Sequence, residues 1–536
     1  MFALLGDANV QCVAAFAKMP GVRVIHARHE HGACTMADGY ARATGRVGIA
    51  SVTCGPGVTQ IVTALTVAAR GRQPVLVFAG DVPTTASWHL HQFEQGPLAA
   101  ITGAHFVPVR SVDHMLDRVR EAFYVARTEL RPVLLSVPLD LQQMRFPWPP
   151  DYMPAAACFP RPQRMPPDPN LVDELVDMIA HAKHPIIVAG RGVLRSAAGA
   201  EWEMLAEKCG ALLGTSLFAM GLFEGNPFAI GVAGSFSGHL AREQYAACDL
   251  LIGVGAGLGH YTTEAGFLFP DARVVQIDAN PHGLYQGLRV ADLHIRADAK
   301  AAAEAVLNRL RERGITGSGF RTPALAACIA AEARMAPDSK PFPVAPDSVD
   351  QRAVMAELDR VIPKDWDIVV GVGQYSSIAL SHLRGRRPER YHVMNDFGAI
   401  GSGLSAAIGI AVARNDGKVL LIEGDGGLLM HVQELDTVRQ HGVRLLACVM
   451  NDGAYGAELH KLRAHGMDAS EAIHGRADLA AVAGAFGLRS AMVNTLGRIE
   501  PLFRDHWRSD KAELWDVCID GAIPSAAYRR VLFAET

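Results

Sequence analysis

A glycine-rich acidic turn, Gly-Asp-Gly-Gly at 424–427, follows the apolar run 418–423. An amphipathic segment and a second apolar run come next, and these end at the Asn-Asp-Gly turn 451–453. Glycines let backbone N–H groups approach a phosphate closely, and a helix start adds the positive end of its dipole. Mg²⁺ prefers oxygen ligands and shares them with phosphate. This order of elements predicts a magnesium and diphosphate site where two neighbouring strands end.

A second set of polar residues, His29, Glu30 and His31, lies near the start of the chain, at a predicted strand-to-helix boundary. The next predicted strand ends in Cys-Gly-Pro-Gly at 54–57, a second turn where a ligand could approach the backbone. A carboxylate in such a place can serve a reaction or can simply cap a helix. Taken alone, Glu30 leaves both interpretations open.

The composition is that of a globular enzyme with several domains. The 536 residues suggest about three domains, and 49% hydrophobic with 20% charged residues is ordinary for such a chain. A net charge of −4 gives no reason to expect binding to nucleic acid or to an anionic membrane. The start shows no secretory signal, and the apolar stretch 399–413 is too short to span a membrane. Nine scattered cysteines predict buried free thiols, and we expect a cytoplasmic protein.

Two proline-rich stretches, 146–169 and 337–346, read as linkers and argue against regular structure. The predicted domains are therefore 1–145, 170–320 and 345–536. Within each domain, short apolar runs alternate with amphipathic segments, which predicts an α/β fold of three doubly wound parallel sheets. The predicted strands are 22–26, 47–52, 74–79, 132–137, 185–189, 250–254, 274–277, 366–370, 391–394, 419–423 and 444–450.

Five motifs give the chain a family resemblance. They are the segments 28–33 (Arg-His-Glu-His-Gly-Ala), 38–42 (Asp-Gly-Tyr-Ala-Arg), 55–57 (Gly-Pro-Gly), 398–404 (Gly-Ala-Ile-Gly-Ser-Gly-Leu) and 424–452. With these motifs, essentially the whole chain resembles the thiamine-diphosphate-dependent enzyme superfamily, in its pyruvate decarboxylase and acetohydroxyacid synthase branch. The resemblance implies a pyrimidine-binding domain, a central domain and a diphosphate-binding domain, in that order.

The resemblance also implies roles for individual residues. Glu30 would hydrogen-bond the pyrimidine ring of the cofactor and drive formation of a thiazolium ylid. Ile400 would support the bent cofactor from below, although by itself it could be an ordinary core isoleucine. The implied cofactor-binding residues are Glu30, Gly373, Gln374, Gly398, Ile400, Gly424, Asp425, Gly426, Gly427, Asp452 and Tyr455.

The implied Mg²⁺ ligands are the side chains of Asp425 and Asp452 and the carbonyl of Ala454. The family carries Asn-Asn where this chain has Asn451 and Asp452, so the aspartate is a departure that adds negative charge. The alternative that Asn451 is the ligand stays open.

Substrate-side candidates also come from the resemblance. Asp7 lies in a turn like that of pyruvate decarboxylases, and Glu458 falls where those enzymes carry a second active-site glutamate. His89 and His91 lie in the region of their paired histidines, and Glu94 is near a glutamine that the synthases place by the cofactor. These residues could share protons with the substrate, or they could belong to polar surface loops.

Two features depart from the family pattern. The chain begins at Met1 directly before the first motif, so either the start is truncated or the domain edge is built differently. Residues 253–261 replace the Arg-Phe-Asp-Asp type of sequence found in FAD-containing synthases. Bound FAD is therefore not expected.

Asp7, Glu458 and the histidines slightly favour a 2-oxo acid decarboxylase (a C–C lyase). The ylid adds to the substrate carbonyl, CO₂ leaves, and the resulting enamine is protonated. The alternative is an acetolactate synthase-like carboligase (a transferase), in which a second carbonyl captures the enamine. A non-catalytic protein that binds thiamine diphosphate and, last, a dinucleotide oxidoreductase complete the hypotheses. The family resemblance implies a homodimer or homotetramer. The 2-oxo acid, the acceptor and any regulatory subunit stay undetermined.

Overall fold

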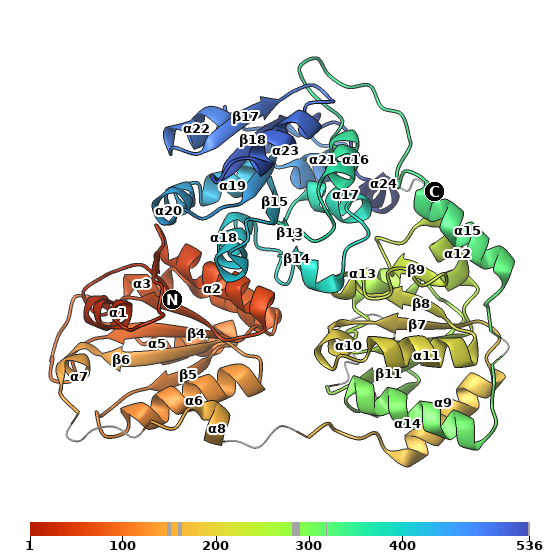
Figure 1. The fold of residues 1–536 in the computed structure, drawn as a ribbon, viewed down its shortest axis with the longest axis horizontal. Coiled ribbons are helices and arrows are strands. Elements are labelled where there is room, and N and C mark those ends of the chain that lie inside the picture. The colour runs from red at the N-terminus through yellow and green to blue at the C-terminus, as the bar shows by residue number, and fades with distance from the viewer. Residues whose placement is uncertain (147–151, 159–162, 281–289, 318, 534–536) are drawn as a thin grey trace. The chain divides into compact units, whose positions relative to one another are not determined.

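The computed structural model describes residues 1–146, 152–158, 163–280, 290–317 and 319–533. Three six-stranded sheets dominate it, and their neighbouring strands pair in parallel throughout the described residues (Figure 1). Helices follow the strands along the chain, as crossover connections between parallel strands require. The predicted α/β fold with three parallel sheets is confirmed.

The first sheet has the order β2-β1-β3-β4-β6-β5. Its strands are β1 (Phe2–Ala3), β2 (Ile25–His26), β3 (Gly48–Val52), β4 (Val75–Asp81), β5 (His105–Pro108) and β6 (Val133–Pro138). Its helices are α1 (Val10–Ala17), α2 (Glu30–Thr44), α3 (Pro56–Thr59), α4 (Val62–Arg70), α5 (Gln95–Thr102), α6 (Met115–Thr128) and α7 (Leu139–Gln143), and α8 (Ala155–Cys158) follows. β6 is buried at every position, as expected for a strand with helices on both faces.

The second sheet has the order β12-β11-β10-β7-β8-β9. Its strands are β7 (Pro185–Ala189), β8 (Leu212–Thr215), β9 (Ala229–Val232), β10 (Leu250–Val254), β11 (Arg273–Asp278) and β12 (Leu293–Arg296). Its helices are α9 (Pro169–His181), α10 (Arg191–Arg195), α11 (Gly199–Cys209), η1 (Leu217–Ala219), α12 (His239–Ala246), α13 (His260–Thr263), η2 (Glu264–Gly266), α14 (Ala299–Glu312) and α15 (Pro323–Arg334). The segment 253–261 thus lies at the end of β10 and the start of α13.

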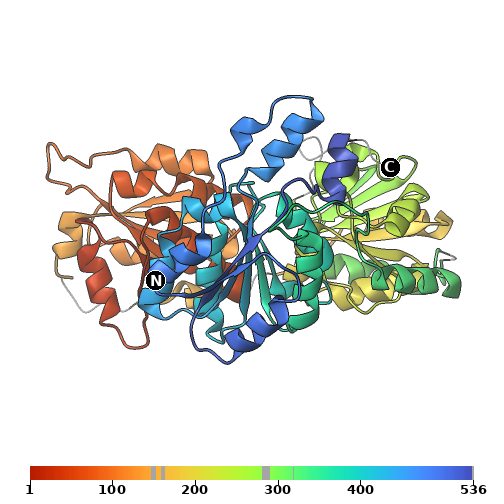
Figure 2. The same ribbon diagram turned by 90° about the horizontal axis from the view of Figure 1, so that it is seen from above.

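The third sheet has the order β14-β13-β15-β16-β18-β17. Its strands are β13 (Asp367–Val370), β14 (Tyr391–Val393), β15 (Val419–Gly424), β16 (Leu446–Asn451), β17 (Arg489–Val493) and β18 (Glu513–Cys518). Its helices are α16 (Gln351–Val361), α17 (Gln374–His382), η3 (Pro388–Arg390), α18 (Gly403–Arg414), α19 (Asp425–Met430), α20 (Glu434–His441), α21 (Gly456–Ala464), η4 (Ser470–Ala472), α22 (Leu479–Ala485), α23 (Ile499–Trp507) and α24 (Ala526–Phe533). Figure 2 shows helices on both sides of these strands.

Close contacts between chain segments group the first and third sheets into one compact unit, residues 1–160, 342–380 and 392–536, while 161–341 and 381–391 form another. Helices α2 and α18 lie side by side within the first unit (Figure 1). A Cβ on Gly39 would lie 2.3 Å from the Ala406 oxygen, and one on Gly409 would lie 2.0 Å from the Met36 oxygen. Glycine at these two positions therefore lets the helix backbones touch.

The motif at 38–42 has a structural explanation in the same region. The buried Arg42 guanidinium pairs with Asp38 on its own helix at 3.1 Å and with Asp396 before α18 at 2.7 Å. Burial of such charges is costly unless they are paired and hydrogen-bonded, and here both conditions are met. The arginine therefore ties the two sheets together.

Each of the eleven strands predicted from the sequence corresponds to a strand of the structure, with ends shifted by up to three residues. Seven strands of the described residues were not predicted: β1, β5, β8, β9, β12, β17 and β18. β1 has two residues, and β8 and β9 have four each, so their apolar runs are short. β5, β9, β12 and β17 lie at sheet edges, and β12 and β17 lack a continuous apolar run. β18 is fully buried but carries Glu513 and Asp516, which interrupt the pattern.

One of the two linker predictions is confirmed, and the other is wrong in part. No helix or strand occurs over 337–346, as predicted. Parts of 146–169 lie outside the described residues, and the expectation of no regular structure there was wrong for 155–158, which form α8. Six of the nine cysteines are buried, and all nine are free thiols. No helix within the described ranges is long and apolar enough to cross a membrane, and 399–413 contributes to the short α18.

Candidate functional site

The glycine-rich acidic turn lies at the carboxyl edge of the third sheet. β15 ends at Gly424 and α19 begins at Asp425, while Gly424 pairs with Met450 near the end of the neighbouring β16. The Asp425 carboxylate accepts hydrogen bonds from the Gly426 N–H at 2.9 Å and from the Gly453 N–H at 2.8 Å. The parallel register therefore brings the two turns together, as the sequence predicts.

Asp452 lies beside Asp425 in this edge. Burial raises the pKa of Asp452 to about 7, and the Asp425 charge adds to that effect. Burial also raises the pKa of Asp425. Two half-desolvated carboxylates that repel each other are unfavourable without a cation, and they are the ligands that Mg²⁺ prefers. The donor set at this edge therefore fits a magnesium ion.

Asn451 has a different orientation from its neighbour. Its side-chain nitrogen donates to the Ala477 oxygen and to the Asp516 carboxylate, both at 2.9 Å. The amide nitrogen of Asn451 is therefore engaged with β18 and with Ala477, which precedes α22. Its amide oxygen is buried without a hydrogen-bond partner, so both Asp452 and Asn451 stay open as the second metal ligand. Ala454, the third predicted ligand, is buried, and its N–H donates to the Asp452 carboxylate at 3.1 Å.

Gln374 is the first residue of α17 and is 3% exposed, and both polar atoms of its side-chain amide lack a hydrogen-bond partner. A Cβ on Gly456 would lie 3.0 Å from Cγ of Gln374 and 2.7 Å from a carboxylate oxygen of Asp452. Buried polar atoms normally have partners. An unpaired amide next to the acidic pair thus indicates a ligand at this place.

The other predicted cofactor residues line the same region in part. Gly373 and Gly424 both abut the Tyr375 ring, where a Cβ would clash. A Cβ on Gly426 would come within 3.0 Å of the Tyr455 ring. A Cβ on Gly427 would likewise come within 3.0 Å of the Glu423 carboxylate. Small residues are therefore required along this turn for packing as well as for approach of a ligand. Gly398 has a φ of 71° with open space around it, and Ile400 and Tyr455 are 37% and 45% exposed.

Two partners of the acidic turn were missed in the sequence. His474 lies with Nε2 3.8 Å from an Asp425 carboxylate oxygen, and its ring contacts Tyr455 edge-to-face. Glu423 is buried below the turn and accepts a hydrogen bond from the Tyr375 hydroxyl at 2.6 Å. No spacing signal links His474 to Asp425. The acid inside the apolar run 418–423 was a signal for Glu423, because a charge within a buried strand needs a partner.

Glu30 begins α2, and the ring of His29 accepts the His31 N–H at 3.0 Å as the helix cap. A Cβ on Gly57 would lie 3.6 Å from the Glu30 carboxylate, so the second glycine turn approaches this acid closely. The cap role is taken by His29, which leaves the half-buried Glu30 carboxylate available for a ligand. The structure therefore brings Glu30 and the turn 55–57 together.

Three of the substrate-side candidates are exposed in this chain. Asp7 is exposed in the turn after β1, and Glu94 is exposed as the residue before α5. The Glu458 side chain is 58% exposed and pairs with Lys461 at 3.3 Å, one turn along α21. These placements leave the surface-loop alternative open for all three residues.

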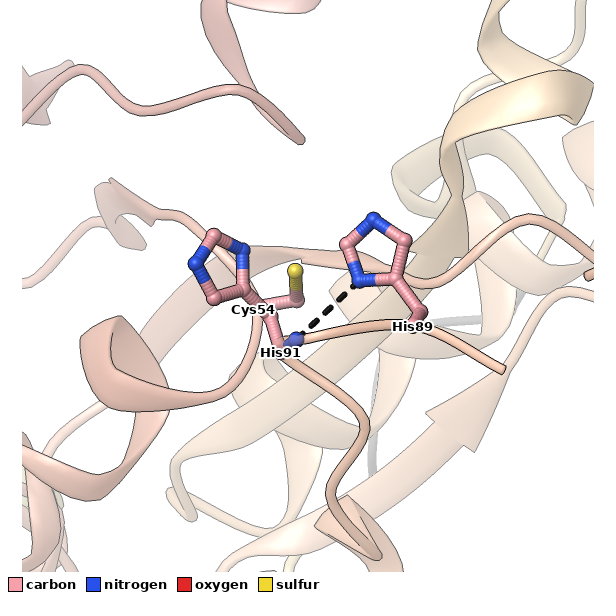
Figure 3. Close-up of side chains that lie close together, drawn as sticks. All are labelled: Cys54, His89 and His91. Atoms are coloured by element: carbon pink, nitrogen blue, oxygen red, sulfur yellow. Dashed lines mark hydrogen bonds between the residues drawn. The ribbon is translucent and has the colours of Figure 1, made fainter.

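His89 and His91 belong to the segment after β4 and lie against Cys54, which follows β3 (Figure 3). The backbone N–H of His91 donates to Nδ1 of His89 at 3.1 Å, and the two imidazole rings meet edge-to-face. The predicted histidine pair is therefore assembled, and it includes a thiol that the sequence analysis did not associate with it.

Three family models match the chain, one for each sheet. Residues 1–101 match the thiamine pyrophosphate enzyme N-terminal TPP binding domain, 172–306 match the central domain, and 371–517 match the C-terminal TPP binding domain. The acidic turn lies in the third match, and Glu30 lies in the first.

Similar proteins cover most of the chain. A putative acetolactate synthase large subunit of Mycobacterium tuberculosis is 30% identical over 89% of this chain and 86% of its own length. A probable acetolactate synthase 2, chloroplastic, of Oryza sativa subsp. japonica is 28% identical over 97% and 80%. A probable acetolactate synthase large subunit of Methanocaldococcus jannaschii is 28% identical over 92% and 85%.

Proposed function

The chain belongs to the thiamine-diphosphate-dependent enzyme superfamily, and on this premise we propose that it is an acetolactate synthase-like carboligase. Such an enzyme removes CO₂ from one 2-oxo acid and joins the remaining fragment to the carbonyl of a second. The observation that carries the proposal is the Asp425 and Asp452 pair beside the unpaired Gln374 amide. The names of the similar proteins favour the carboligase.

This proposal reverses the order of the sequence analysis, which ranks a decarboxylase first on the strength of Asp7, Glu458 and the histidine pair. Glu458 forms an exposed ion pair with Lys461, and Asp7 is exposed in this chain. In a carboligase a second carbonyl captures the enamine carbon, whereas a decarboxylase needs a proton donor at that carbon. The exposed positions of Asp7 and Glu458 weaken the case that they are dedicated proton donors, and this agrees with the carboligase.

The residues of the third sheet would hold the diphosphate end of the cofactor. Asp425, Asp452 and the Ala454 carbonyl would bind Mg²⁺, and the Gln374 amide would meet a diphosphate oxygen. Thiamine diphosphate, when bound, supplies a nucleophilic carbon and an electron sink. Glu30 would hold the proton at the pyrimidine ring of the cofactor, close to the turn 55–57.

We also propose a homodimer, which can pair again into a tetramer. Large apolar side chains are exposed around the acidic turn and on the segment after β4, and a second copy of the chain would cover them. They are Phe397, Ile400, Leu429, Met430, Tyr455, Trp88, Leu90 and Phe93. A fully active monomer in sedimentation velocity would contradict this proposal.

Product analysis tests the reaction directly. The purified chain with thiamine diphosphate and Mg²⁺ is given pyruvate and other 2-oxo acids, alone and in pairs, and with aldehydes as acceptors. The carboligase predicts acetolactate and CO₂ from pyruvate, with little free aldehyde. Acetaldehyde and CO₂ from pyruvate, without acetolactate, would establish the decarboxylase instead.

The Glu30→Gln variant separates an enzyme from a non-catalytic protein that binds the cofactor. Glutamine keeps the shape of the side chain but cannot hold the proton as a carboxylate does. Binding of thiamine diphosphate should persist, while turnover and exchange of the thiazolium proton should fall at least about 100-fold. If the wild-type chain binds the cofactor but shows neither turnover nor exchange of the thiazolium proton, the non-catalytic alternative is established.

A further inference from the structure

We propose that Cys54, His89 and His91 form a second metal site, which binds Zn²⁺ or a similar transition-metal ion and is distinct from the magnesium site. One potential ligand atom from each of the three residues lies within 4.8 Å of the other two. The cysteine sulfur lies between the two imidazole rings (Figure 3). A thiolate and two imidazoles are the donors that zinc binds in proteins.

The geometry is close to that of a zinc site with three protein ligands and one open position. Zinc binds sulfur at about 2.3 Å and imidazole nitrogen at about 2.0–2.1 Å, so tetrahedral ligand atoms are about 3.4–3.6 Å apart. Moving the ligand atoms together by about 1 Å, through small side-chain rotations, would complete three bonds. Three protein ligands leave a fourth position for water or for an oxygen of a substrate, as in zinc enzymes.

The histidine rings are positioned by the protein rather than by solvent. Nδ1 of His91 is buried without a hydrogen-bond partner, and such an atom normally has one. Nδ1 of His89 accepts the backbone N–H of His91 at 3.1 Å, and a bond from this nitrogen to a metal ion would replace that hydrogen bond. A metal ion would give the buried His91 nitrogen the partner that the protein does not supply.

The turn after β3 is shaped for this contact. Gly55 has a φ of 59°, and a Cβ at this position would lie 2.7 Å from the His91 oxygen. Only glycine combines that backbone conformation with such a close approach. The segment after β4 can therefore lie directly on the Cys54 turn and bring both histidines to the thiol.

The surroundings of Cys54 favour a cation. The Cys54 side chain is 1% exposed, and the Asp81 and Asp7 carboxylates are near enough to interact with it electrostatically. Asp81 is held by the Val82 N–H at 2.8 Å and by the Ser136 hydroxyl at 2.5 Å. A divalent ion at the sulfur would offset part of the negative charge of these two carboxylates.

The donor set also selects the metal. Thiolate and imidazole ligands favour Zn²⁺, Cu⁺ or Co²⁺ over the hard ions Mg²⁺ and Ca²⁺. An imidazole nitrogen bound to a metal ion cannot accept a proton, so a loaded site would take one nitrogen of each of His89 and His91 out of proton transfer. The site lies next to the turn 55–57 that contacts Glu30, where a substrate oxygen could reach the open position.

Cobalt spectroscopy tests the proposal on the full-length protein. The chain is stripped with a chelator, reloaded with thiamine diphosphate and Mg²⁺, and titrated with Co²⁺. We expect one equivalent per chain, with a sulfur-to-cobalt charge-transfer band and d–d bands of tetrahedral intensity, and displacement by Zn²⁺. Cys54→Ser should abolish the charge-transfer band and weaken Zn²⁺ binding by at least about 100-fold, beyond the 10–100-fold of outer-shell changes.

Two further variants make the result specific. His91→Gln should keep a charge-transfer band but weaken binding, whereas Cys328→Ser, which removes an exposed thiol elsewhere, should change nothing. Retention of thiamine diphosphate binding shows that each variant is folded. Unchanged cobalt spectra in Cys54→Ser, or a stoichiometric loss in Cys328→Ser, would overturn the proposal. Since the readout is metal binding, it stands or falls separately from the carboligase.

Discussion

The first and third sheets present two ligand sets at equivalent places, the carboxyl ends of neighbouring parallel strands. In the third sheet, Asp425 and Asp452 follow β15 and β16 and offer carboxylate oxygens. In the first sheet, Cys54 follows β3 while His89 and His91 follow β4, and they offer sulfur and nitrogen. The parallel-sheet architecture therefore fixes where each ligand set lies, and the side chains determine which metal ion it can bind.

The two sets also differ in how firmly they are held. Asp425 is 4% exposed, and two backbone N–H groups fix its carboxylate. The histidines lie eight and ten residues beyond the end of β4, whereas Asp425 and Asp452 directly follow their strands. Rigid ligands lower the cost of binding, whereas ligands on a loop must be ordered first. We infer that the acidic edge is the better organised of the two.

The largest effect should come from Asp425→Asn. The change removes the charge from the more buried carboxylate, so Mg²⁺-dependent binding of thiamine diphosphate should weaken about 100-fold or more. Fluorescence titration of the cofactor at several Mg²⁺ concentrations measures it. The exposed Asp510→Asn should behave as wild type, and an unaltered Asp425→Asn would remove the acidic edge from the comparison.

Next in size is the contact that joins the two sheets. Gly409→Ala places a Cβ 2.0 Å from the Met36 oxygen, so α2 and α18 must separate and the free energy of unfolding should fall by about 2 kcal/mol. Urea unfolding measures the change. Gly484→Ala, also in a helix but with its nearest neighbour at 3.6 Å, should stabilise by about 0.5–1 kcal/mol. Equal effects of the two substitutions would show that the helix contact is not tight.

Asp452→Asn restores the family's amide and should have a smaller effect. The amide oxygen still binds Mg²⁺, but with one charge fewer the affinity should fall by about tenfold. Asp452→Ala removes the ligand atom and should cost clearly more. If the two variants are equally weak, the charge and not the oxygen matters. If neither changes Mg²⁺ affinity, Asn451 becomes the ligand to test.

The smallest effect concerns the histidines between the sheets. His31 and His431 stack at 4.5 Å, and burial lowers their pKa values to about 3 and about 4, with the neighbouring histidines adding to this. In the unfolded chain both would titrate near 6.5. Unfolding therefore takes up protons below about pH 6.5, and stability should fall as the pH is lowered from there towards 4.

His431→Phe keeps a stacking ring and removes one of the two titrating histidines. The melting temperature of this variant should therefore fall less between pH 7 and pH 5 than that of the wild type. The exposed His239→Phe should leave the pH dependence as in the wild type. An unchanged slope in His431→Phe would mean that other groups cause the acid sensitivity.

Strands with continuous apolar runs, such as β7 and β10, were predictable to the residue, because a strand buried on both faces has no polar positions. Strand β18 was not, since it contains acids whose hydrogen-bond partners can be distant in sequence, as Asn451 is for Asp516. The acidic edge was predictable because each ligand directly follows its strand. His474 was not, because only the folded chain brings it near Asp425.

The sequence by itself determined three parallel sheets, two glycine turns and the acids at Glu30, Asp425 and Asp452, because apolar runs and glycines act locally. Only the tertiary structure decided that Asn451 is engaged with β18 and that Cys54 meets two histidines about 35 positions later. Parallel pairing places the ends of distant strands at one edge, and no local pattern of residues encodes which side chains face each other there.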